Sequence, residues 1–369
     1  MTSDKSPTGG TPSTPEPDEP TPSLAPGRIE EIAEKILGGP RTLTMLELAE
    51  QAGVEIELAR TFWRGMGFKN VAENEPHFVA ADVDALRKWK LALATGRMDE
   101  TTLMSLLRAQ SYTTDRMALW QVEAMVDTIQ RQQGLEDTAA RTATLEILDE
   151  VDDFLAAQLD YTWRRHLVDL AERTDAEIRS RLVPVETDRL PLPRALGFVD
   201  MVSFTSRARQ LGSRELAELV QGFEFTARDV ITANGARVVK TAGDAVLYIA
   251  DDVLTGARVS LAMIDAISSQ ERLLPVRASL VWGRVVSRSG DIFGPAVNLA
   301  SRLVDIAPRN TLYTDASTAA LLSKSPHAAD FLVIDHPAED LPGIGDVAPV
   351  ELRWSSPEVR EDVWIPGLA

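Results

Sequence analysis

Residues 195–205 read ALGFVDMVSFT, a short apolar run that ends in the acidic residue Asp200. Such a run predicts a buried strand with a carboxylate at its end. The pattern beyond it predicts a helix, two short strands around a glycine turn, a second helix and another strand. The order βαββαβ is typical of a ferredoxin-like arrangement. The expected bounds are 195–200, 214–234, 237–240, 245–249, 251–269 and 276–286, followed by a helix over 295–306 and a strand over 312–314.

The first half of the chain has a helical pattern instead. Ile29, Ile32 and Ile36 recur at helix spacing, and no segment is a convincing strand. The half is therefore expected to be an all-α domain that ends in a long helix. Helices are expected over 28–37, 44–51, 55–66 and 82–94, two more between 103 and 129, and a long amphipathic stretch over 138–182.

Proline-rich segments mark the expected boundaries. Residues 1–27 hold seven Pro and nine Ser or Thr, so they bury too little apolar surface to offset their ordering entropy. Pro184, Pro191 and Pro193 separate the two halves. We therefore expect an α+β protein with a disordered tail over 1–27, an all-helical domain over 28–183, a linker over 184–192 and a second domain over 193–369.

The composition is that of a globular protein with an acidic surface. At ~150 residues per domain, 369 residues correspond to two domains. The 56 acidic and 38 basic residues give a formal charge of -18, which repels phosphate backbones, so no nucleic-acid partner is expected. The absence of Cys excludes disulfides and cysteine-ligated metals and fits a cytoplasmic location. No transmembrane segment or signal-peptide core is expected.

Two clusters of the second half place charged groups where strands end. Asp200 ends the first strand, and its alternative role is to cap the helix that follows. The run Lys240-Thr-Ala-Gly243-Asp244 spans a strand, a turn and the next strand. Gly and Asp are also favoured at an ordinary hairpin tip, so this run alone does not distinguish a site from a turn.

A third cluster combines an acid with a helix. Residues 290–302 read GDIFGPAVNLASR, and Pro295 suits the first position of a helix. Asn298 and Arg302 are then four residues apart on one helix face. Such a pair is ordinary on a surface helix, but Asp291 lies just upstream and is expected to face the same region.

In this order and spacing, the three clusters resemble the catalytic domain of class III nucleotidyl cyclases over residues 192–369. The resemblance implies a ferredoxin-like core and an enzyme that converts a nucleoside triphosphate to the 3′,5′-cyclic monophosphate and pyrophosphate. It implies that Asp200 and Asp244 bind two divalent cations, Mg²⁺ or Mn²⁺, which prefer oxygen ligands.

The resemblance also assigns the groups that hold the substrate. Lys240 and Asp291 match the pair that selects the base; a lysine donates to adenine N1 and a carboxylate accepts from the N6 amine. Guanine reverses both features, so the pair predicts ATP rather than GTP. Asn298 matches the residue that orients the ribose, and Arg302 the one that neutralises charge on the α-phosphate. Arg284 is expected to face the triphosphate, with a solvated surface arginine as the alternative.

The assembly implied by the resemblance is a head-to-tail homodimer. In this family the metal-binding aspartates come from one subunit and the other four groups from its partner, and this chain carries all six. The alternatives are a guanylate cyclase, which Lys240 and Asp291 disfavour, and a catalytically degenerate module for dimerisation or nucleotide sensing.

The helical half resembles the N-terminal regulatory domain of certain soluble bacterial adenylate cyclases. In those relatives the domain inhibits at neutral pH and releases activity in acid, and lipids are implicated, so a proton or lipid effector is expected. His166, in the long helix, is the candidate proton sensor because His changes charge nearest neutrality; a solvated surface His is the alternative. Residues 43–68 also look like a helix-turn-helix, whose second helix is not basic, which favours a structural role.

Overall fold

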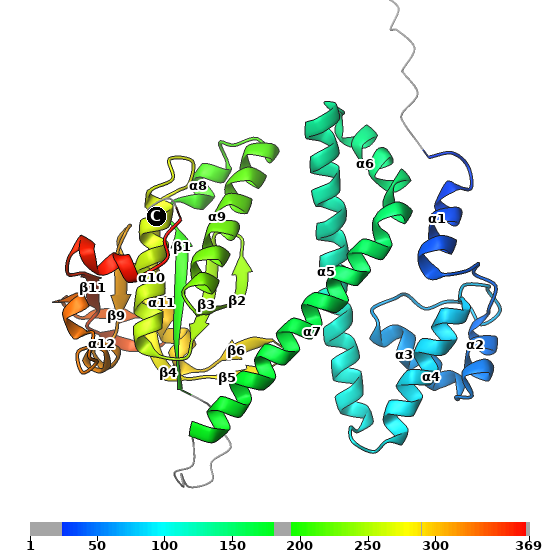
Figure 1. Cartoon of the computed structure of the whole chain (residues 1–369), viewed down its shortest axis with the longest axis horizontal. Coiled ribbons are helices and arrows are strands. Elements are labelled where there is room, and N and C mark those ends of the chain that lie inside the picture. Colours follow the sequence, from blue (N-terminus) through cyan, green and yellow to red (C-terminus); the bar gives the residue numbers. More distant parts are fainter. Residues whose placement is uncertain (1–23, 181–192, 289, 367–369) are drawn as a thin grey trace, which may run out of the picture. The chain divides into compact units, whose positions relative to one another are not determined.

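The computed structural model describes residues 24–180, 193–288 and 290–366 (Figure 1). Backbone contacts divide the chain into two compact units, with the boundary between Val185 and Glu186. The expected linker and residues 1–23 of the expected tail lie outside the described residues. None of the helices in the described ranges is long and apolar enough to cross a membrane.

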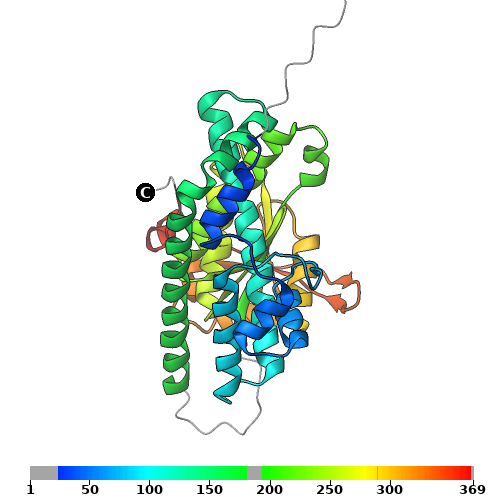
Figure 2. The same cartoon turned by 90° about the vertical axis from the view of Figure 1, so that its right-hand side faces the viewer.

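All regular elements among the described residues of the first unit are helices, as expected. The four short helices expected from the sequence are confirmed, with ends that differ by at most two residues. In Figure 2, α7 is the long green helix of this unit. The elements are α1 (Arg28–Leu37), α2 (Met45–Ala52), α3 (Ile56–Gly65), α4 (Ala80–Ala94), α5 (Glu100–Gln133), α6 (Asp137–Glu146) and α7 (Leu148–Ser180).

Two expectations for this unit are wrong. The two helices expected between 103 and 129 are one continuous helix, α5, because no Gly or Pro interrupts residues 100–133. The stretch expected as one amphipathic segment over 138–182 is two helices, α6 and α7, which meet at Ile147. Ile147 has ψ 0°, outside helical values, and neither Gly nor Pro marks that corner in the sequence.

Helices α2 and α3 form the helix-turn-helix pair and pack with α4 and α5. The Thr44 hydroxyl accepts from the Glu47 N–H, and the Glu47 carboxylate accepts from the Thr44 N–H, so both ends of this capping box are satisfied. On α3, Arg60 forms ion pairs with Glu57 and Glu73, which neutralise it. The two helices share a core with α4 and α5 that includes Met45, Leu48, Phe62, Leu86 and Leu103.

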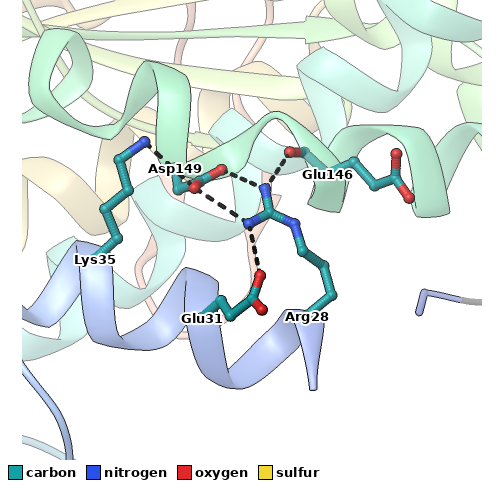
Figure 3. Close-up of polar contacts among 5 residues, drawn as sticks. All are labelled: Arg28, Glu31, Lys35, Glu146 and Asp149. Atoms are coloured by element: carbon teal, nitrogen blue, oxygen red, sulfur yellow. Dashed lines mark hydrogen bonds and ion pairs between the residues drawn. The ribbon is translucent and has the colours of Figure 1, made fainter. Parts of the chain in front are cut away.

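A charged cluster fastens α1 to the corner between α6 and α7 (Figure 3). The Asp149 carboxylate accepts from Arg28 at 2.8 Å and from Lys35 at 3.3 Å. Arg28 also donates to the Glu146 carbonyl oxygen at 2.8 Å. Burial raises the pKa of Asp149, but the bonds from Arg28 and Lys35 outweigh burial and hold that pKa below its ordinary value. The start of α7 is thus tied to the first helix of the unit.

The second unit is built on a seven-stranded sheet in the order β2-β3-β1-β4-β7-β11-β8. Its strands are β1 (Pro193–Met201), β2 (Arg237–Ala242), β3 (Ala245–Ala250), β4 (Val276–Arg284), β7 (Leu312–Thr314), β8 (Phe331–Asp335) and β11 (Val350–Trp354). Two hairpins stand apart from the sheet, β5 (Val286–Arg288) with β6 (Asp291–Phe293), and β9 (Glu339–Leu341) with β10 (Gly345–Val347).

The four strands β2-β3-β1-β4 are antiparallel and form the ferredoxin-like core. Helices α9 (Ser213–Ala233) and α10 (Val253–Ser268) make its two crossovers, so the expected βαββαβ order and the α+β class are confirmed. Strand β7 extends the core in parallel to β4. The remaining helices are α8 (Phe204–Ala208), α11 (Pro295–Ile306) and α12 (Ala316–Leu322), with 3₁₀ turns at Ala328–Asp330 and Pro357–Asp362.

Alternate residues of the sheet face two different cores. Val199 packs with Phe223 and Met263, which come from α9 and α10. Leu196 packs with Leu303 from α11, in a separate cluster. Successive side chains of a strand point to opposite faces, so α9 and α10 cover one face of the sheet and α11 covers the other. Asp200 of β1 and Arg277 of β4 lie on the α11 face, because their neighbours Val199 and Ala278 belong to the opposite core.

We predict that Gly197→Ala destabilises the sheet. A Cβ at Gly197 meets the ring of Tyr248 at 2.5–2.6 Å, and the buried Tyr248 hydroxyl is fixed by a 2.7 Å bond to the Gly256 carbonyl oxygen. Overpacking of this kind costs about 1–3 kcal/mol. Hydrogen exchange of the β1 and β3 amides measures the loss, and Gly212→Ala is the control because its nearest new contact is at 3.9 Å. Equal protection in both variants would contradict the prediction.

Candidate active site

Asp200 and Asp244 lie at one end of the core strands. Asp200 is the penultimate residue of β1, and Asp244 follows Gly243 in the turn between β2 and β3. Gly243 has φ 65°, the left-handed conformation that glycine adopts without strain. The Met201 N–H donates to the Asp244 carbonyl oxygen at 2.8 Å, which holds the turn against the end of β1. The register of the sheet therefore places the two carboxylates near each other.

The surroundings of Asp200 disfavour the ionised form of its carboxylate. Its side chain is 16% exposed, and burial is the main cause that raises its pKa above the ordinary value. The bonds from Arg277 oppose this rise, whereas the negative charges of Asp244 and Asp305 add to it. A divalent cation beside Asp200 and Asp244, in addition to the Arg277 guanidinium, would relieve the repulsion between the carboxylates.

The donor set fits a divalent cation that shares its ligands with a substrate. No group of three or more His, Cys, Asp and Glu side chains among the described residues could hold a metal ion without help. Asp200 and Asp244 supply hard carboxylate oxygens only, which suit Mg²⁺ or Mn²⁺ rather than a soft metal. The remaining ligands must come from water or from substrate oxygens, and triphosphate oxygens are of the right chemistry.

Lys240 and Asp291 form a direct ion pair. Lys240 lies on β2 just after an irregularity in the β2–β3 register, and Asp291 begins β6. The Lys240 Nζ lies 2.6 Å from Asp291 Oδ2, while Asp291 Oδ1 accepts from the Ile292 N–H at 2.8 Å. The bond from Lys240 is the main cause that holds the pKa of Asp291 below its ordinary value. Lys240 and Asp291 are 51 positions apart in the sequence, but their charged groups lie side by side in the fold.

Helix α11 presents the other two motif residues. Pro295 occupies its first turn after Gly294, as expected. Asn298 and Arg302 are both exposed on this helix, and Arg302 makes a 3.3 Å ion pair with Asp305. A Cβ at Gly283 of β4 would lie 2.5 Å from the Cβ of Ala296, so a glycine at that position lets α11 approach the sheet closely.

The motif residues lie in three groups: the two aspartates, the Lys240–Asp291 pair, and Asn298 with Arg302 on α11. No hydrogen bond or ion pair between described residues joins the two aspartates directly to Lys240 or Asp291. Arg284 is exposed at the end of β4, and His166 is exposed in the middle of α7. Arg277, which belongs to none of the sequence motifs, bonds to Asp200 from β4.

The ferredoxin-like sheet order, extended by β7, with α11 on one face, is the fold of a class III nucleotidyl cyclase catalytic domain. The two carboxylates lie at the end of β1 and in the turn between β2 and β3, the Lys–Asp pair lies on β2 and β6, and the Asn and Arg lie on α11.

Comparison with known proteins narrows this class. The chain is 36% identical over 340 residues to an adenylate cyclase of Glutamicibacter nicotianae, covering 90% of this chain and 84% of that protein. It is 35% identical to an adenylate cyclase of Streptomyces coelicolor, covering 83% of this chain and 80% of that protein. The chain therefore belongs to the adenylate cyclase family.

More distant matches cover less of the chain. A protein of Mycobacterium tuberculosis named pH-sensitive adenylate cyclase is 25% identical, covering 77% of this chain and 71% of that protein. The crystal structure of the adenylyl cyclase CyaB from P. aeruginosa aligns with a TM-score of 0.40 and 17% identity, covering 45% of this chain and 95% of that one. No protein-family model matches the chain.

We predict that Asp291 titrates below the range of an ordinary aspartate and that Lys240→Met raises its pKa. The ammonium of Lys240 stabilises the ionised carboxylate, and methionine removes that charge while keeping a similar length. Carboxyl-carbon NMR of the full chain measures both values. Arg302→Met, which alters a different charge of the unit, is the control; an Asp291 pKa unchanged by Lys240→Met would contradict the prediction.

Proposed function

We propose that this chain converts ATP to 3′,5′-cyclic AMP and pyrophosphate, with divalent cations held by Asp200 and Asp244. The observation that carries the choice of base is the Lys240–Asp291 pair. It offers a donor and an acceptor side by side, which is the complement of the N1 and N6 edge of adenine. The base edge of guanine offers a donor and an acceptor in the opposite order, so it would meet like groups at both positions.

Each motif residue then has a defined task. Lys240 donates to adenine N1, and Asp291 accepts from the N6 amine. Asn298 orients the ribose, and Arg302 neutralises the charge that builds on the α-phosphate as its bond to pyrophosphate breaks. When bound, divalent cations lower the pKa of the 3′-hydroxyl and neutralise the triphosphate. The half-buried Asp200 and its neighbour Asp244 hold these cations close to the reacting oxygens.

The site proposed here is completed by a second copy of the chain, arranged head to tail. The aspartates of one subunit would face the Lys240–Asp291 pair and α11 of the other. Two observations favour this assembly. The described contacts leave the aspartates unjoined to the base-selecting pair, and the β5–β6 hairpin beside that pair exposes Val286 and Phe293. Apolar side chains grouped on an exposed hairpin are typical of an interface.

The helical unit is proposed to regulate this activity, with protons as the effector. His166 lies on the exposed surface of α7, between the Asp160–Arg164 and Asp169–Arg173 ion pairs. A lipid effector has less support. The cavity beside Trp63 and Val71, at about 200 Å³, is itself smaller than the roughly 300–1,000 Å³ of typical ligand pockets.

Mixing two inactive variants tests the activity and the shared site together. We expect Asp244→Ala and Arg302→Ala each to abolish cyclic AMP production, because each removes one half of every site. In mixed dimers one of the two sites is intact, so random exchange of subunits restores about a quarter of the wild-type activity. Cyclic AMP and cyclic GMP formed from ATP and GTP with Mn²⁺ are measured by chromatography.

The separate outcomes of this experiment are informative. Cyclic GMP in preference to cyclic AMP would contradict the assignment of Lys240 and Asp291 to adenine. Activity in the wild type without restoration in the mixture would contradict the shared site. A wild-type chain that forms neither product between about pH 5 and pH 8, the range in which His changes charge, would contradict the proposed function itself.

The proposed proton sensor is tested by the activity profile between about pH 5 and pH 8. If His166 senses protons, we expect His166→Ala to remove the acid-dependent part of the activity and to leave the rest. His327→Ala is the matched control, because His327 is also exposed but lies in the second unit and faces Asp330. Profiles of His166→Ala and wild type that superimpose would exclude His166 as the sensor.

A further inference from the structure

The sheet of the second unit ends on one side in β8, and this edge strand exposes a run of apolar side chains. Leu332, Val333 and Ile334 are 49%, 45% and 37% exposed. β8 pairs with β11 and has no strand on its other side among the described residues. An open edge presents backbone N–H and C=O groups to which another strand can add.

Hydrogen bonds at the two ends of β8 show which backbone groups point towards β11. The His336 N–H donates to the Pro349 carbonyl oxygen at 3.0 Å. The Ser355 N–H donates to the Asp330 carbonyl oxygen at 2.9 Å. In an antiparallel pair the direction of the backbone groups alternates from residue to residue, and the register between β8 and β11 has no irregularity. The even-numbered residues of β8 therefore bond to β11.

The odd-numbered residues are the ones that face the open edge. Their N–H and C=O groups point away from β11, and no hydrogen bond to another described residue occupies them. These residues are Phe331, Val333 and Asp335.

The opposite edge of the sheet differs from β8. There β2 carries Arg237 and Lys240, and its register with β3 is irregular between Val238 and Lys240. Charges and irregularities of this kind discourage the addition of a further strand. β8 reads FLVID, with no Lys, Arg or Pro and a regular register, so its open edge has none of these protections.

We propose that β8 is an interaction surface that pairs antiparallel with β8 of a second copy of this chain, with Val333 opposite the partner's Val333. This register brings every open residue of each strand into a bonded pair, because Phe331 then lies opposite the partner's Asp335. Each open N–H meets an open C=O. The surface is separate from the proposed active site and does not depend on the proposed activity.

The charges along β8 favour a second copy in this register. The chain carries a formal charge of -18, so self-pairing must keep acid from lying opposite acid. With Val333 at the centre, Asp335 lies opposite an apolar residue, and Asp330 lies opposite the partner's His336. A pair centred on Asp335 would instead set two carboxylates against each other. Pro337 has no N–H, so it ends the pairing on that side.

Pairing would cover apolar side chains on both faces of the edge. Val333 is the cross-strand neighbour of Leu352, which belongs to the core under α9 and α10. Leu332 and Ile334 lie on the other face, where each would lie opposite the other residue of the second copy. A strand of five residues is a small contact beside the roughly 1,200–2,000 Å² of stable interfaces. We therefore expect concentration-dependent association, strengthened where chains that are already dimeric present two such edges.

A single cysteine tests the register, because the chain has no Cys. Opposite residues of a bonded antiparallel pair have Cα atoms about 5.5 Å apart, within the roughly 4.4–6.8 Å that a disulfide spans. We expect Val333→Cys in the full chain to form a disulfide-linked dimer under mild oxidation, measured by non-reducing electrophoresis. Ile344→Cys is the matched control, since Ile344 is 40% exposed in the turn between β9 and β10. We expect it to crosslink about tenfold more slowly or less.

Val333→Lys tests the association itself, because it sets two like charges opposite each other at the centre of the pair. Sedimentation velocity of the wild-type chain is expected to show a larger species that grows with concentration. We expect Val333→Lys to shift this step at least about tenfold in concentration, and Ile344→Lys to retain it. Val333→Pro repeats the test without a charge, since the Val333 N–H does not bond to β11. Melting temperatures identify any variant that is unfolded.

Two results would overturn the proposal. The first is disulfide formation at equal rates in Val333→Cys and Ile344→Cys, which marks random collision. The second is identical sedimentation of the wild-type, Val333→Lys and Val333→Pro chains at every concentration. In that case, slow hydrogen exchange of the open amides of β8 would assign the edge to another segment of the same chain. A chain that forms no cyclic AMP contradicts the proposed function and leaves these measurements unaffected.

Discussion

The register of β1 between β3 and β4 is the constraint on which the second unit depends. β1 pairs with β3 over Ala195–Asp200 and with β4 over its whole length. This register sends Val199 into the core under α9 and α10, and Leu196 into the core under α11. A slip by one residue would exchange the two faces and turn Asp200 away from α11. The packing that stabilises the sheet therefore also decides where the carboxylate lies.

Small residues set the distance between this sheet and the helix that carries Asn298 and Arg302. Gly283 leaves room for Ala296, and the buried Ser279 hydroxyl donates to the Ala300 carbonyl oxygen at 2.7 Å. The helix cannot move away from β4 without breaking that buried bond, which leaves an unsatisfied polar group. The exposed Asn298 and Arg302 are therefore held in position by buried contacts between α11 and β4. These contacts are either apolar or fully hydrogen-bonded.

The sequence predicted the helix boundaries best where the backbone preference of a single residue decides the local geometry. Gly38, Gly53 and Pro295 mark helix ends, and each stands where its backbone preference predicts. The corner at Ile147 has no such marker, because tertiary contacts such as those of Asp149 decide it. Arg277 escaped notice for a related reason. It is 77 residues from Asp200, and only the cross-strand register joins them, so a pattern read along the chain could not pair them.

Asp200, Lys240 and Arg302 are already paired within the chain, and this has a consequence for substrate binding. Asp200 is bonded to Arg277, Lys240 to Asp291, and Arg302 to Asp305. At 2.6 Å, the Lys240–Asp291 contact leaves no space for a base between the two groups, so in the proposed site adenine would either meet both from one side or separate them. Exposed ion pairs contribute only about 0–1 kcal/mol, and two hydrogen bonds to the base replace the one that opens. The paired state would therefore cost the proposed substrate little to displace.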